Sequence, residues 1–141
     1  MIKPEDLRIG DLVRVCCDCE FPEGTLRTVS EIRILNVSER TMGVVKLIPT
    51  NGNDDEWQEV WCGNIEGIPL TPEILEKNGW YFDADFVLSC IRDDHCFEVK
   101  FPPGSGWKYA VMGSETLRRF KYVHELQHIL WALGYNAELK I

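Results

Sequence analysis

Short runs of strand-forming residues, separated by turn residues, dominate the first 70 positions of the chain. The longest run is TLRTVSEIRILNV at residues 25–37, which is rich in β-branched residues that favour extended backbone. Further runs are LVRVCCDC at residues 12–19, TMGVVKLIP at 41–49 and WQEVWCGNI at 57–65. Four or five short antiparallel strands within about 65 residues indicate a small SH3-like β-barrel over residues 1–70.

The segment PLTPEILEKNGW, residues 69–80, carries the signals of a short helix between two halves of the chain. Thr71 suits the N-cap, Pro72 suits the first helical position, and Asn78-Gly79 suits the end. We therefore expect a second domain over residues 71–141, or one compact unit in which the two halves share a core.

The second half predicts an antiparallel sheet and one helix. FVLSCIR at residues 86–92 and HCFEVKF at 95–101 form a hairpin around Asp93-Asp94, with Cys90 opposite Phe97. WKYAVMG at residues 107–113 is another strand, and apolar periodicity predicts a helix from about Phe120 to Leu133, stopped by Gly134. The chain as a whole is therefore expected to be α+β, with the sheet of the second half packed against its C-terminal helix.

That helix spells HELQH at residues 124–128, the H-E-x-x-H pattern of zinc peptidases. Two histidines at positions i and i+4 share a helix face and can reach one zinc ion, and the adjacent Glu125 would act as general base. A catalytic zinc takes three protein ligands, however, and no downstream histidine completes the set. The remaining histidine, His95, lies at the expected hairpin, and its spacing from the helix does not require it to be the third zinc ligand.

A helical wheel places Leu126 at the centre of the apolar stripe and His124 and His128 on the opposite side. Trp131 shares that side, and Phe120 lies at its edge. Exposed aromatic side chains on a helix indicate contact with a partner more than proteolysis. We assign no catalytic residue, cofactor or metal, and the candidate partner contacts are Phe120, His124, His128 and Trp131.

Charge weighs against a general nucleic-acid-binding role. The formal net charge is −8, and an acidic surface repels phosphate. Arg14, Arg27 and Arg33 on the expected barrel form the alternative nucleic-acid surface. A small basic patch at Arg118, Arg119 and Lys121 is interpreted as a solvated helix start.

Neither a signal peptide nor a membrane segment is expected. The start MIKPEDLRIGDL lacks an apolar run, and no stretch approaches the roughly 20 apolar residues that cross a bilayer. We therefore expect a cytoplasmic protein in which the six cysteines are reduced thiols. The CCDC cysteines, Cys16, Cys17 and Cys19, lack C-x-x-C spacing and are interpreted as small strand residues.

Three stretches resemble a family of small uncharacterised proteins from phages and mobile elements of gut Bacteroidetes: DLRIGDLV, GIPLTPEILEKNGW and KYVHELQHILWALG. The family pattern at the helix reads Y-V-H-x-L-Q, often with Gln at the position of Glu125. The resemblance therefore implies a packing or contact motif, with His124 and Gln127 tying the helix to neighbouring backbone.

The resulting expectation is a phage- or mobile-element-associated, non-enzymatic interaction module of the bacterial host cytoplasm, with a protein partner. One alternative is a zinc-dependent hydrolase using His124 and His128 with Glu125 as base. The second alternative is a nucleic-acid-binding small barrel. The sequence does not set the oligomeric state.

Overall fold

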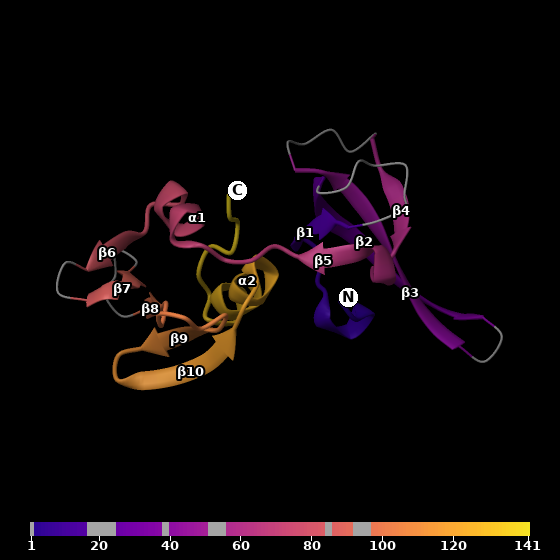
Figure 1. Ribbon diagram of the computed structural model, residues 1–141. Coiled ribbons are helices and arrows are strands. Elements are labelled where there is room, and N and C mark those ends of the chain that lie inside the picture. Colours follow the sequence, from indigo (N-terminus) through magenta and orange to yellow (C-terminus); the bar gives the residue numbers. More distant parts are fainter. Residues whose placement is uncertain (1, 17–24, 38–39, 51–55, 84–85, 92–96) are drawn as a thin grey trace. The chain divides into compact units, whose positions relative to one another are not determined.

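In the described residues, each half of the chain contains an antiparallel sheet, and two α-helices belong to the second half (Figure 1). The computed structural model describes residues 2–16, 25–37, 40–50, 56–83, 86–91 and 97–141. The chain divides into two compact units, Met1–Ile68 and Pro69–Ile141. The expected α+β class is thus confirmed, and no described helix has the length and apolar character needed to cross a membrane.

The first unit is one five-stranded antiparallel sheet with the strand order β4-β3-β2-β1-β5. Its strands are β1 (Leu12–Val15), β2 (Leu26–Val37), β3 (Arg40–Pro49), β4 (Gln58–Trp61) and β5 (Ile65–Gly67). Two short 3-10 helices accompany them, η1 (Pro4–Asp6) and η2 (Cys62–Asn64). In the described pairing the sheet is open, with β4 and β5 at its edges.

The core of this unit follows from strand alternation. Val13 and Val15 of β1, Val29 of β2 and Val45 of β3 have no exposed surface, because alternate side chains of each strand point to the same face. The register of β2 against β3 shifts between Val29 and Glu31, and such a bulge bends a strand. The long β-branched run at residues 26–37 is therefore one strand with a break in its pairing.

The second unit begins with α1 (Pro72–Lys77), as the local signals predict. Pro72 is its first residue, Asn78 is the C-cap, and Gly79 has a φ of 80°, a backbone conformation that favours glycine. Thr71 occupies the N-cap position, but its side chain makes no capping hydrogen bond. Instead, a hydrogen bond with the Thr71 side chain is the main cause that lowers the pKa of Glu73.

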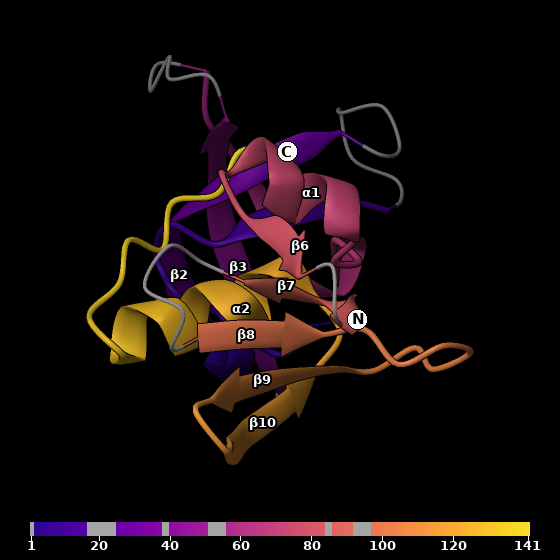
Figure 2. The ribbon, with the colours of Figure 1, turned by 90° about the vertical axis from the view of Figure 1, so that its left-hand side faces the viewer.

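The sheet of the second unit is an antiparallel meander with the order β10-β9-β8-β7-β6. Its strands are β6 (Tyr81–Asp83), β7 (Phe86–Ile91), β8 (Phe97–Lys100), β9 (Lys108–Met112) and β10 (Glu115–Phe120). The helix α2 (Val123–Ala132) follows β10 and lies against one face of this sheet, as Figure 1 and Figure 2 both show.

Large apolar side chains fill the space between α2 and the sheet. Phe97, Phe120, Leu126 and Leu130 have no exposed surface. The ring of Trp80 meets Phe97 edge to face, with 5.7 Å between ring centroids, an arrangement that aromatic pairs favour. Burying each of these side chains contributes about 1.5–3 kcal/mol to the stability of this unit.

Two sequence expectations about this unit are wrong. Residues 115–120 form β10 where the sequence indicated a solvated helix start, because Gly113, with a φ of 59°, turns the chain back along β9. The helix therefore begins at Val123 and not at Phe120. Cys90 pairs opposite Val99, not Phe97, so the hairpin is shifted by two residues from a tight Asp93-Asp94 turn. The turn itself and His95 lie outside the described residues.

Candidate functional site

Glu125, the supposed general base of HELQH, has a structural partner at the start of α2. Its Oε2 accepts the backbone N–H of Lys121 at 2.8 Å and that of Tyr122 at 3.0 Å. The first turn of a helix leaves N–H groups without intrahelical partners, and a glutamate at the third helical position commonly satisfies one. The carboxylate therefore caps the helix.

The two histidines of the motif lie side by side, but the more N-terminal one is enclosed. Their ring centroids are 5.9 Å apart, as expected for positions i and i+4. His124 is only 3% exposed and stacks on the ring of Tyr122 with a centroid separation of 5.8 Å. The helical wheel placed both histidines opposite the core face, on an exposed face or in a cleft; His124 is not on an exposed face, and His128 is half-buried.

A helical wheel identifies the buried face of a helix from its apolar residues alone. The helix α2 also buries polar residues outside that face, such as His124 and Gln127. Gln127 is also buried, and its Nε2 donates a hydrogen bond to the backbone carbonyl of Ala137 at 3.2 Å. The C-terminal segment is held further by Asn78, which exchanges two hydrogen bonds of 2.8 Å with the backbone of Lys140. The expectation that Gln127 ties the helix to neighbouring backbone is confirmed.

A metal site needs more ligands than this pair supplies. Within the described ranges, no group of three His, Cys, Asp or Glu side chains is placed to hold a metal ion. Catalytic zinc normally takes three protein ligands together with a water molecule. His95, Cys17 and Cys19 lie outside the described residues.

Of the four candidate contact residues, Trp131 is the most accessible. Its side chain is 67% exposed near the end of α2, and His128 lies three residues earlier on neighbouring helix surface. We call His128 and Trp131 the Trp131 surface. Phe120, by contrast, is the last residue of β10, and its side chain is fully buried in the core. It is therefore excluded as a contact residue.

Strand pairing divides the basic patch that the sequence grouped together. Arg118 lies opposite the buried Ala110, whereas Arg119 lies opposite Tyr109, so the two arginines point to opposite faces of the sheet. The Arg119 guanidinium lies 4.7 Å and the Lys121 Nζ 4.3 Å from the ring centroid of Trp107. We call Trp107, Arg119 and Lys121 the Trp107 cluster.

Sequence reasoning missed the Trp107 cluster because its members are distant in the sequence: Trp107 directly precedes β9, whereas Arg119 and Lys121 lie at the end of β10. The local signals were a tryptophan after the loop at residues 102–106 and the basic patch, and nothing in the sequence joined them. No family model, curated protein or solved structure matches the chain, so the site rests on its own geometry.

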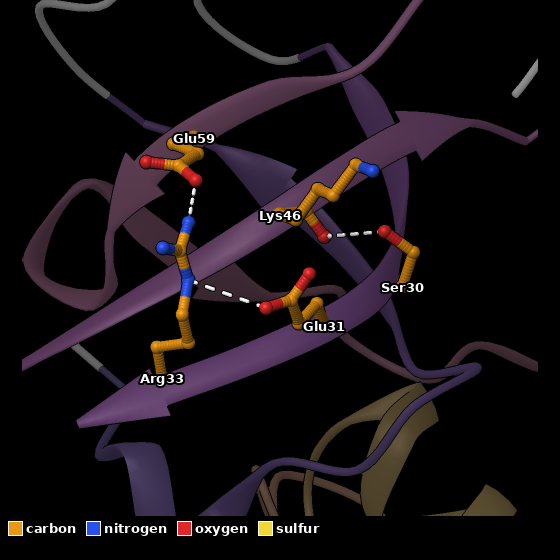
Figure 3. A network of polar contacts seen from close by, with 5 residues as sticks. All are labelled: Ser30, Glu31, Arg33, Lys46 and Glu59. Carbon is orange, nitrogen blue, oxygen red and sulfur yellow. Dashed lines mark hydrogen bonds and ion pairs between the residues drawn. The ribbon is translucent and has the colours of Figure 1, made fainter. Parts of the chain in front are cut away.

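The arginines proposed for a nucleic-acid surface on the first unit are engaged by carboxylates. Arg14 forms an ion pair with Glu66, with 2.7 Å between its terminal nitrogen and Oε1. Arg33 lies between Glu31 and Glu59 and forms an ion pair with each of them, as Figure 3 shows. Such pairs reduce the positive charge that a phosphate would meet. Arg27 is half-buried on β2.

The structure describes two cysteines of the first unit. Cys16 is half-buried and Cys62 is buried. Burial raises the pKa of the Cys62 thiol, and the Glu5 carboxylate raises it further, so its reactive thiolate form is disfavoured. Cys62 therefore acts as a small apolar core residue.

Proposed function

We propose that the chain is a non-enzymatic protein-interaction module of a phage or mobile element, working in the cytoplasm of its bacterial host. The exposed Trp131 carries this proposal. Tryptophan is enriched among the residues that dominate protein interfaces, because it buries a large apolar area while keeping one polar N–H. On α2 it stands on a helix whose other side is anchored in the core, so the side chain is presented from a rigid element.

We also propose that the first unit is an SH3-like small barrel. The strand order β4-β3-β2-β1-β5, the register shift within β2 and the 3-10 turn between β4 and β5 support this assignment. Small barrels of this kind support many unrelated functions, so the fold by itself names no ligand.

The two alternative functions have less support. A zinc hydrolase would need Glu125 as a base, but its carboxylate accepts two backbone N–H groups, and His124 is enclosed. A nucleic-acid-binding barrel would need Arg14 and Arg33, which are paired with glutamates. A protein-interaction module is compatible with the contacts that Glu125, Arg14 and Arg33 already make.

The test compares two exposed tryptophans. Affinity capture from a Bacteroidetes lysate, with quantification by mass spectrometry, uses the wild type, Trp131→Ala and Trp57→Ala. Trp57 lies in the first unit and is 51% exposed, so it is a matched control for general surface apolarity.

A partner that Trp131→Ala loses and Trp57→Ala retains is the expected result. Equal retention by both variants, or capture of nothing above background by the wild type, would contradict the proposed contact.

A further inference from the structure

Two cations share one aromatic ring on the outer face of the β9–β10 hairpin. Arg119 and Lys121 are two residues apart in an extended stretch, so they project to the same side, and both lie over Trp107. The pairing of Arg119 with Tyr109 and of Phe120 with Lys108 sets this position. The buried Phe120 between the two cations anchors the strand to the core.

The backbone holds each member of the Trp107 cluster in place. The Trp107 N–H donates to Ser105 Oγ at 3.1 Å, and the Ser105 N–H donates to the Pro102 carbonyl at 3.2 Å. Lys121 donates its N–H to Glu125 and accepts the Leu70 N–H at 3.0 Å through its carbonyl. A site ordered before binding loses less conformational entropy when a ligand arrives.

Among the described residues, neither cation of the cluster has a side-chain ion pair with an acid. No carboxylate there lies within 4.0 Å of the Arg119 guanidinium nitrogens or of the Lys121 Nζ, and the Glu125 carboxylate contacts Lys121 only through its backbone N–H. Elsewhere in the same chain, Arg14, Arg33 and Lys100 each have a glutamate partner. Two cations held on one ring repel each other, and an anion placed between them would turn that repulsion into attraction.

We propose that the Trp107 cluster binds an acidic, extended segment of a protein partner, with carboxylates at alternate positions. Arg119 and Lys121 are separated by about 6–7 Å along extended backbone, which equals the spacing of side chains i and i+2 in an extended peptide. An arginine guanidinium can bind a carboxylate through two parallel hydrogen bonds, and the Trp107 ring holds the Arg119 and Lys121 cations beside each other.

Two observations favour a peptide over a nucleic acid. A long phosphate chain would meet the rest of a molecule whose formal net charge is −8, whereas a short acidic segment meets only the cluster. The Arg119 and Lys121 cations also occupy the ring of Trp107 on which a base would stack.

The segment is bound through side chains and not as an added strand. β10 is an edge of the sheet, but its register shifts between Thr116 and Arg118, and such bulges blunt an edge against further pairing. The inference goes beyond the proposed function, because it concerns a surface that does not include Trp131.

Fluorescence anisotropy at low ionic strength tests the proposal with three labelled probes. They are a peptide of four Glu-Ser repeats, the same peptide with Gln in place of Glu, and an eight-nucleotide thymidine strand. The cluster variant is Arg119→Gln/Lys121→Gln. The matched control is Lys77→Gln/Lys140→Gln, which removes the same charge from two exposed lysines outside the cluster.

We expect the Glu-Ser peptide to bind best, with affinity about tenfold weaker for the cluster variant and within about twofold for the control and for Trp131→Ala. Circular dichroism confirms that the variants are folded. Failure of the Glu-Ser peptide to bind, equal weakening by the control, or preference for the thymidine strand would each overturn the proposal. The last result would assign the cluster to single-stranded nucleic acid.

Discussion

The Glu125 carboxylate accepts the backbone N–H of Tyr122 at 3.0 Å, which makes the glutamate of HELQH a helix cap. The same oxygen accepts the N–H of Lys121, so one side chain closes the helix start and positions a member of the Trp107 cluster. A glutamate with this role needs only an acceptor oxygen, and a glutamine also has one. The protease-like spelling is therefore compatible with a purely structural role of Glu125.

Substitutions of Glu125 should distinguish the contribution of helix capping to stability from the contribution of its negative charge. Glu125→Ala is expected to lower the free energy of unfolding by about 0.5–2 kcal/mol, as for other lost helix caps, and Glu125→Gln by less because the acceptor remains. Urea denaturation measures both. Glu138→Ala removes the same charge from an exposed position and serves as control. Equal losses for Ala and Gln would show that charge, and not capping, is the contribution of Glu125.

The metal content of tag-free protein tests the zinc-hydrolase alternative. Because Glu125 caps the helix and His124 is enclosed, we expect zinc far below one ion per chain by elemental mass spectrometry. The His124→Ala/His128→Ala variant should give the same value. His128→Ala, which leaves the buried His124 in place, serves if the double variant does not fold. Near-stoichiometric zinc that disappears in these variants would restore the peptidase hypothesis.

Local signals predicted the elements that local chemistry controls. The Pro72 start and the Asn78-Gly79 end of α1 needed no tertiary information, because proline and glycine restrict or permit backbone angles by themselves. β10 could not be predicted in this way. Its TLRRF segment also suits a helix, and only the Gly113 turn and the pairing with β9 make it a strand.

The candidate site was harder to predict from the sequence than the fold was. Apolar periodicity found the core face of α2, but contacts of Tyr122 and of the C-terminal segment bury further residues of the helix. The Trp107 cluster depends on hairpin register, which places residue 107 beside residues 119 and 121. A register differing by one residue would move both cations to the other face.

Gly43 on β3 allows η1 to approach the sheet. A Cβ at this position would lie 2.8 Å from Cys62 Sγ and would also overlap the ring of Pro4. Gly43→Ala is therefore expected to lower the free energy of unfolding by about 1–3 kcal/mol through overpacking. Gly106→Ala is the control, since no atom lies within 4 Å of its Cβ position. Similar urea midpoints for both variants would show that η1 moves away at little cost.

Cys62 should make stability depend on pH in the alkaline range. Burial and then the Glu5 carboxylate raise the pKa of its thiol, so the folded state keeps the proton to higher pH than the unfolded state does. This contribution is complete below the pKa of the unfolded thiol and is lost as pH rises through the raised pKa of the folded state.

The corresponding measurement is urea denaturation from neutral to alkaline pH for the wild type and Cys62→Ala. The variant should lose less stability over that range than the wild type, whatever its stability at neutral pH. Parallel pH profiles would mean that the thiol ionises equally in both states. Peptide mapping after alkylation should also find Cys62 modified later than the half-buried Cys16.

Truncation to alanine should destabilise the protein strongly at Phe120 and hardly at all at Trp131, although the sequence placed both residues on one helix face. Phe120 has no exposed surface, so Phe120→Ala is expected to lower the free energy of unfolding by about 3–5 kcal/mol through lost burial and a cavity. Trp131 is 67% exposed, and Trp131→Ala should change it by no more than about 0.5 kcal/mol.

Thermal and urea unfolding of both variants, with Phe120→Leu as an intermediate step, measure this difference. A large loss for Trp131→Ala would mean that Trp131 stabilises the fold, and its effect on partner capture would then no longer report a contact. A stable Trp131→Ala protein that loses its partner would separate binding from folding, because the helix that presents the side chain would be intact.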